Sequence, residues 1–131
     1  MNKKELTLSV LEEMGYSPEV DDDGDIFFRY QMKSMFVMMG NEEEDYVVVM
    51  MPQFADVESD EETLNLIVCN KITREMKIAK VYLEKNLQAV TATCEFFYKN
   101  AEDFKNSMEH SLEILGVIRT AYNHVKSEMK E

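Results

Sequence analysis

The side chains best suited to binding a metal lie in one acidic segment near the N-terminus. Acidic residues occupy alternate positions from Glu19 to Asp25, with Gly24 at the sixth position, as in the first half of an EF-hand calcium loop. That loop needs a bidentate glutamate at its twelfth position, where this sequence has Tyr30. The flanking residues indicate a turn and a strand rather than two helices. We therefore interpret the segment as an acidic turn, with a weak cation site as the alternative.

Two other patterns are compatible with metal ligation only in part. His110 and Glu113 are three residues apart, like half of a carboxylate-bridged metal site, but no matching motif occurs elsewhere. His124 lies about 21 Å further along the same predicted helix, too far to share a metal with His110. Methionines such as Met38 and Met39 suit copper(I), but neighbouring side chains of a strand point to opposite faces. The sequence therefore predicts no metal site and no cofactor.

Neither cysteine predicts a catalytic nucleophile. Cys94 alternates with residues expected in the core, and Cys69 lies on a predicted helix with its exposure undetermined. No Cys-His pair, nucleophile elbow, Gly-rich phosphate loop or zinc-ligand spacing is present. Two cysteines do not indicate a disulfide framework, and Glu5, Glu12 and Glu13 interrupt any signal-peptide core. We predict a protein of the cytoplasm that is not an enzyme.

Apolar residues recur at helical spacing in three segments, which are residues 3–14, 60–74 and 101–128. Asn2 and Gly15 are the predicted cap and stop of the first helix, and Ser59 begins a predicted capping box for the second. Asn100 is the predicted N-cap of the third helix, which is longer than a small domain needs. Gly116 lies in its middle and predicts a close approach or a bend.

Strand-forming residues fill the segments between these helices, in Ile26–Tyr30, Met35–Met39, Tyr46–Met51 and a second hairpin at residues 77–98. A short extra strand at Glu19–Asp21 is an alternative reading of the acidic turn. The predicted order is α-β-β-β-α-β-β-α. We therefore predict one α+β domain over residues 1–131, with an antiparallel sheet packed by the long C-terminal helix.

The first three strands have apolar residues on both faces, which predicts a binding surface. One helical layer covers one face, so the second is covered by the two short helices, covered by a partner chain, or exposed. Six of the 11 methionines lie in or beside these strands, and flexible thioethers accept several partner shapes. The predicted partner-binding residues are Phe27, Phe36, Met38, Val47, Val49 and Met51.

The charge of the chain is unevenly distributed. The formal net charge is −12, but residues 1–70 hold 17 acidic and 4 basic residues whereas residues 71–131 hold 9 and 10. An acidic protein repels phosphate, so we predict no binding to nucleic acid or to an anionic membrane. The sequence contains no stretch of about 18 apolar residues, the length that a membrane-spanning helix needs, so we predict no membrane span. The acidic segments Glu42–Asp45 and Asp56–Glu62 favour a basic partner, or keep a Met-rich domain soluble.

The element order, the small size, the acidic balance and the amphipathic C-terminal helix resemble the class I type III secretion chaperones. The same fold occurs in the YbjN-like bacterial family, described as sensory transduction regulators. The segment from Gly15-Tyr16 to Asp25-Ile26-Phe27-Phe28-Arg29-Tyr30 and the stretch Cys94-Glu95-Phe96-Phe97-Tyr98 are similar to the YbjN-like group. The resemblance implies a non-enzymatic homodimer that binds other polypeptides and has no catalytic residue.

Two functional hypotheses of different classes follow. The first is a chaperone- or adaptor-like module that captures an extended peptide or a partner helix on the apolar, Met-rich sheet face. The alternative is a regulatory or sensory domain that binds a small ligand between the sheet and the C-terminal helix. In that case polar groups such as Arg119 or Tyr122 converge on a pocket.

Overall fold

The computed structural model describes residues 1–130, which form three helices and a six-stranded antiparallel sheet. The helices and strands are α1 (Lys3–Glu13), β1 (Glu19–Val20), β2 (Ile26–Tyr30), β3 (Lys33–Met38), β4 (Tyr46–Asp56), α2 (Glu62–Glu75), β5 (Ala79–Leu83), β6 (Ala89–Phe97) and α3 (Ala101–Lys130). The predicted α+β class and long C-terminal helix are confirmed. The two-residue β1 is the extra strand that the acidic turn left open.

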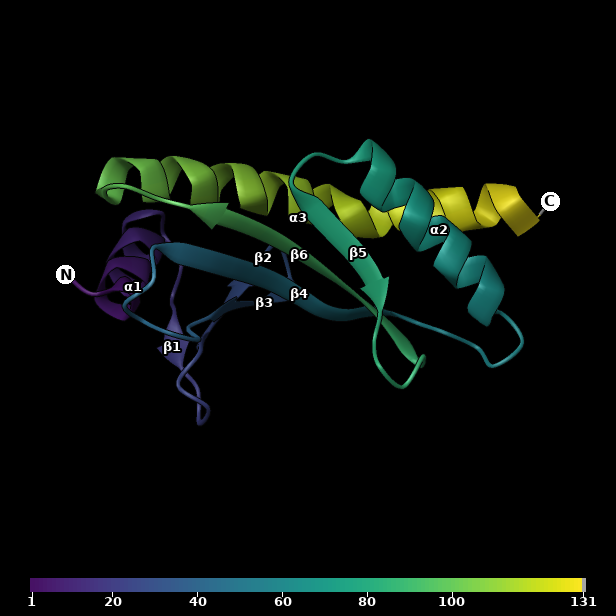
Figure 1. Ribbon diagram of the computed structural model, residues 1–131, viewed down its shortest axis with the longest axis horizontal. Coiled ribbons are helices and arrows are strands. Elements are labelled where there is room, and N and C mark those ends of the chain that lie inside the picture. Colours follow the sequence, from purple (N-terminus) through teal and green to yellow (C-terminus); the bar gives the residue numbers. More distant parts are fainter. Residues whose placement is uncertain (131) are drawn as a thin grey trace.

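The strands are arranged in the order β1-β2-β3-β4-β6-β5, and every neighbouring pair is antiparallel. The chain leaves the sheet after β4, forms α2, and returns to add β5 and β6 beside β4 (Figure 1). Long strands β4 and β6 therefore form the centre of the sheet, and the first hairpin and β5 flank them. Helix α3 runs along the length of this layer (Figure 1).

Helix α1 begins and ends where the sequence predicts. The Oδ1 atom of Asn2 accepts a hydrogen bond from the Glu5 backbone N–H at 2.8 Å. Gly15 adopts a φ of +96°, and the N–H groups of Gly15 and Tyr16 donate to the carbonyls of Glu12 and Leu11. These two bonds form a Schellman motif, which needs the left-handed conformation that glycine adopts without strain.

The start of helix α2 differs from the prediction. The capping box at Ser59 is wrong, because residues 58–61 form a turn and the N-cap is Glu61, whose side chain makes no cap hydrogen bond. Instead, the Glu61 carboxylate accepts Lys126 at 3.4 Å and Lys130 at 2.7 Å, both from the end of α3. Ion pairs between helices thus replace the predicted local cap.

Helix α3 supplies half of the largest fully buried side chains. Its N-cap Asn100 accepts the Asp103 N–H at 2.8 Å, as predicted. Gly116 marks a close approach, since a Cβ atom at this position would lie 3.0 Å from Cε1 of Tyr30. The end of the β2–β3 hairpin therefore packs directly on α3. The fully buried residues of its inner stripe are Phe104, Met108, Leu112, Leu115, Ile118 and Tyr122.

Strand β4 contains a bulge that carries it five residues past its predicted end at Met51. The pairing register with β6 shifts between Met51 and Ala55, and Gln53 takes a φ of +48°. The Gln53 N–H donates to Oγ1 of Thr91 at 3.0 Å. Beyond the bulge the alternation is reset, so Phe54 packs edge-on against Tyr122 with ring centroids 5.4 Å apart.

All three helices contribute to one hydrophobic core on one side of the sheet. Buried residues of α1, α2 and α3 join a single cluster with the inward-facing residues of the strands. Of the alternatives for the second sheet face, coverage by α1 and α2 is therefore excluded. Among residues 1–130, no helix lies on the opposite face, which we call the outer face (Figure 1). No helix in this range is long and apolar enough to cross a membrane.

Candidate functional site

The outer face has an apolar half, formed by the first hairpin, the start of β4 and the end of β6. Phe36 pairs with Met50 and Met38 pairs with Val48 across β3 and β4, and Phe36 also packs on Phe27 with centroids 5.2 Å apart. All five side chains are partly exposed. Three of the six predicted site residues, Phe27, Phe36 and Met38, therefore lie together on the open face.

The other three predicted site residues lie on the opposite side of the sheet. Val47, Val49 and Met51 are buried in the core at 0%, 0% and 2% exposure. Val49 pairs with Val37 and Cys94, which also point inward. The prediction placed the two alternating sets of β4 in the wrong phase, because both sets are apolar and the sequence does not mark which one faces the helices.

The sequence-based prediction missed four residues of the outer face, and one of them is the most exposed aromatic residue of the site. Tyr46, Val48 and Met50 are the true outer set of β4, and Phe97 is 79% exposed at the end of β6. Tyr46 stacks on Phe97 with centroids 5.0 Å apart and an interplanar angle of 22°. The tyrosine hydroxyl was the available signal, since a phenol prefers a face that leaves its oxygen near water or a polar partner.

A polar network borders this apolar half. Lys80 of β5 forms an ion pair with Glu95 of β6, and Glu95 also accepts a hydrogen bond from the Tyr46 hydroxyl. Burial raises the pKa of Glu95, but the bonds from Lys80 and Tyr46 outweigh this effect and hold the pKa below its ordinary value. The network fixes the Tyr46 ring, and with it the stacked Phe97, at the edge of the apolar half.

The acidic turn lies at the other end of the apolar half. A groove of about 310 Å³ is lined by carboxylates of the turn and by Phe36, Met38 and Met50. Oδ1 of Asp21 accepts the N–H groups of Asp23 and Asp25 at 2.9 and 3.0 Å, and Oδ1 of Asp25 accepts the Met39 N–H at 2.8 Å. These bonds turn the chain rather than form a calcium loop. The described residues contain no cluster of three or more ligands for a metal.

Part of the acidic segment before α2 forms ion pairs within the protein. Glu61 binds Lys126 and Lys130, and the hydrogen bond from Lys130 holds the pKa of the Glu61 carboxyl below its ordinary value. The carboxylates beside the groove are instead those of the turn at residues 21–25. Negative charge therefore lies directly beside exposed apolar side chains, which is the arrangement that a basic and apolar segment complements.

The β5 edge of the sheet is closed to an added strand at its centre. The Thr73 hydroxyl of α2 accepts the Val81 N–H at 2.8 Å and donates to the Val81 carbonyl at 3.1 Å. Both main-chain groups that an added strand needs at this position are thus already satisfied. A strand added at the centre of this edge would therefore have to break both bonds to Thr73.

The candidate nucleophiles and histidines do not form a reactive constellation. Burial raises the pKa of the Cys69 thiol to about 11 and that of Cys94 to about 12, so both thiols stay protonated near neutral pH. Cys94 donates to the Ser111 carbonyl, whereas Cys69 lies beside Tyr122. His110 is exposed on α3. Cys94 is a core residue, as predicted, and the exposure of Cys69 is now settled as buried.

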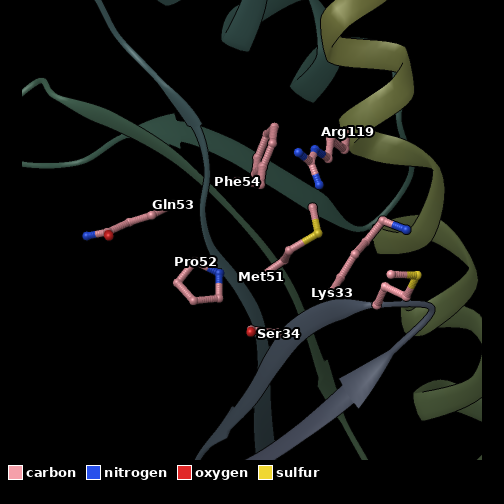
Figure 2. Close-up of a pocket in the computed structure, with 8 residues that line it drawn as sticks. Lys33, Ser34, Met51, Pro52, Gln53, Phe54 and Arg119 are labelled. Carbon is pink, nitrogen blue, oxygen red and sulfur yellow. The ribbon is translucent and has the colours of Figure 1, made fainter.

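A pair of cavities lies at the rim of the sheet, between β4 and α3, and we call them the rim cavity. The two cavities have volumes of about 210 and 460 Å³, and Gln53, Phe54 and Arg119 line both of them. Figure 2 shows Arg119 extending from α3 toward Phe54 and Met51, while Lys33 extends from the β2–β3 hairpin toward α3. Gln53 points away from them (Figure 2). The inner residues of α3 are buried in the core, and the cavity that Arg119 lines lies at this rim.

The fold and the site together define a class of small α+β domains in which helices cover one face of an antiparallel sheet and leave an apolar face open. A family model described as "T3SS (YopN, CesT) and YbjN peptide-binding chaperone 1" (TY-Chap1) matches residues 2–129. The chain therefore belongs to this family of peptide-binding chaperones, which confirms the resemblance to the YbjN-like proteins and secretion chaperones.

Solved structures share the fold at low sequence identity. The crystal structure of YbjN from E. coli, a candidate transcription regulator, matches 95% of this chain and 92% of its own with a TM-score of 0.69 and 12% identity. An uncharacterized protein from Methanothermobacter thermautotrophicus matches 91% of this chain and 98% of its own, with a TM-score of 0.50 and 12% identity. No curated protein sequence matches the chain.

Proposed function

We propose that this protein binds an extended, basic and apolar segment of another polypeptide on its outer face. The observation that carries the proposal is the open apolar half of that face, with Phe97 79% exposed beside the stacked Tyr46. Exposed apolar patches bordered by polar residues are typical of protein-binding surfaces. Membership of a family of peptide-binding chaperones supports the same conclusion.

The groove at the acidic turn supplies both affinity and selectivity. One large apolar side chain of the partner fits among Phe36, Met38 and Met50, and its burial contributes about 1.5–3 kcal/mol. The flexible thioethers adapt to anchors of different shapes. A lysine or arginine next to that anchor meets the carboxylates of Asp21 and Asp23. The proposed partner is therefore a segment that alternates apolar and basic residues.

Fluorescence anisotropy with two 12-residue probe peptides tests this proposal. One peptide contains leucine, lysine and serine, and the other replaces each lysine by glutamate. We expect the lysine peptide to bind at least tenfold more tightly, and we expect Asp23→Asn to reduce this preference. Asp23 makes no side-chain hydrogen bond among residues 1–130, so its neutralisation leaves the turn intact. Equal affinities for the two peptides contradict the proposed charge selection.

The apolar contribution has a matched pair of variants. Phe36→Ser with Met50→Ser shortens two groove residues, whereas Leu66→Ser with Ile67→Ser shortens two exposed apolar residues of α2. We expect the first pair to weaken binding of the lysine peptide at least tenfold and the second to leave it unchanged. A loss confined to the α2 pair would place the binding surface on α2.

Two further properties remain predictions of this proposal. A homodimer is expected, and light scattering at micromolar concentration measures it, with a monomeric mass contradicting it. A cytoplasmic location is expected from the sequence, and fractionation of the source cells tests it.

The second candidate function is a regulatory domain that binds a small ligand. It is favoured by the rim cavity, whose larger part is lined by Arg119 and Tyr122, the two residues named by the sequence for such a pocket. The site differs from the one expected, because the ligand would lie at the rim of the sheet and not beneath α3.

A further inference from the structure

The rim cavity concentrates positive charge in a strongly acidic chain. Lys33, Arg119 and Lys126 line its two parts, with Lys126 paired to Glu61, and Asp56 is the one acidic residue among the linings. Arg119 forms no ion pair with any residue of the described range, 1–130. Guanidinium groups present several N–H donors in a fixed plane that matches carboxylate and phosphate oxygens. An unpaired arginine beside a lysine is thus suited to an oxyanion.

The surface exposed to the cavity is mostly polar, and apolar side chains supply a minor part of it. Met51 and Pro52 line the smaller part, and Phe54 borders both parts (Figure 2). The larger part, of about 460 Å³, falls within the range of small-molecule sites, whereas the smaller part, of about 210 Å³, lies below it. A ligand that fits this space therefore presents mainly polar or charged groups to its walls.

The cavity is built from backbone segments held in uncommon conformations. Met32 and Gln53, both in its lining, have φ values of +66° and +48°. Met32 lies in the two-residue turn of the first hairpin and Gln53 lies in the bulge of β4, which account for these φ values. Gly116 allows Tyr30 to approach α3 one turn before Arg119, which sets the hairpin end that carries Lys33 against the helix. The two cations are therefore positioned by the fold rather than by flexible loops.

We infer that the rim cavity binds a small molecule that carries a carboxylate or phosphate group, with Arg119 as the principal contact of the oxyanion. This inference specifies the ligand class for the second candidate function. It does not depend on peptide binding at the outer face, so either proposal can fail while the other holds.

Titrations monitored by ¹⁵N–¹H NMR test the inference with three probes of similar size, phenyl phosphate, benzoate and the neutral benzyl alcohol. We expect phenyl phosphate or benzoate to shift the amide signals of Gln53 and Phe54 in a saturable way. Benzyl alcohol is expected to bind at least tenfold more weakly. Saturation by phenyl phosphate alone identifies a phosphate ester, and saturation by benzoate alone identifies a carboxylate; either result supports the inference.

Arg119→Gln supplies the decisive variant, and Arg74→Gln is its matched control. Both arginines are exposed residues of helices, but Arg74 lies at the end of α2, outside both linings. We expect Arg119→Gln to weaken binding of the preferred anion at least tenfold and Arg74→Gln to leave it unchanged, with both circular dichroism spectra like that of the parent. No saturable shift with either anion, or equal losses in the two variants, overturns the inference.

Discussion

Val48 and Val49 are neighbours in β4 with the same side chain and opposite environments. Val49 is fully buried among inward-facing residues, whereas Val48 is partly exposed on the outer face opposite Met38. Truncation of each valine to alanine therefore removes the same atoms from a packed core in one case and from an open surface in the other. The difference measures which face of β4 the helices cover.

The expected cost at Val49 follows from its burial. Removing two buried methyl groups loses about 1.6 kcal/mol of transfer free energy, and the remaining cavity raises the loss in unfolding free energy to about 2–3 kcal/mol. Val48→Ala is expected to cost less than about 1 kcal/mol. For a chain of this size the corresponding fall in Tm is about 6–12 °C at Val49 and under about 4 °C at Val48.

Urea denaturation followed by circular dichroism measures both free energies, and Met50→Ala and Met51→Ala repeat the comparison one step along β4. Met51 is core-facing and Met50 lines the groove, so we expect the larger loss at Met51. Equal losses within each pair, or the larger loss at Val48 and Met50, would refute the assignment of the two faces.

Three further predictions concern the core and the sheet edge. The unfolding free energy should fall as pH rises from 9 toward 11–12, because the native thiols of Cys69 and Cys94 resist ionisation while those of the unfolded chain lose their protons. Urea titrations at several pH values measure the slope of the unfolding free energy against pH, and Cys69→Ala should remove about 1.4 kcal/mol per pH unit from that slope. Gly116→Ala should gain about 1 kcal/mol of helix stability in a Tyr30→Ala background and less in the parent, as a double-mutant cycle will show, and equal gains would contradict the close approach. Thr73→Val should cost about 1 kcal/mol and speed hydrogen exchange at the Val81 amide, and unchanged exchange would contradict closure of the edge.

The sequence predicted the ends of helices well where a residue type has a strong preference for one capping position. Asn2, Gly15 and Asn100 each take the predicted capping role, because short polar side chains and glycine have few other functions at helix ends. Gly116 likewise marks a real close approach. Ser59 failed because the chain turns before α2 and the acidic residue Glu61 binds lysines 65 or more positions away, a tertiary effect that no local pattern contains.

The candidate site was half predictable for a different reason. In β2 the charged Arg29 shares a face with Phe27, which pairs with Phe36 of β3, so polarity marks the outer side of the first hairpin. In Tyr46–Met51 every side chain is largely apolar, and the phase of the strand depends on its pairing with β3 and β6. The bulge at Gln53 resets the alternation once more. Both features arise from pairing between distant segments.

The most direct test of the central claim is ¹³C-methyl NMR of the methionines during titration with the lysine probe peptide. The methionines sample both faces of the sheet, since Met38 and Met50 line the outer groove while Met35, Met51 and Met108 are buried in the core. The proposed function predicts saturable shifts of the Met38 and Met50 methyl signals, with little change in the three core methionines. Saturable binding that leaves Met38 and Met50 unshifted would contradict it.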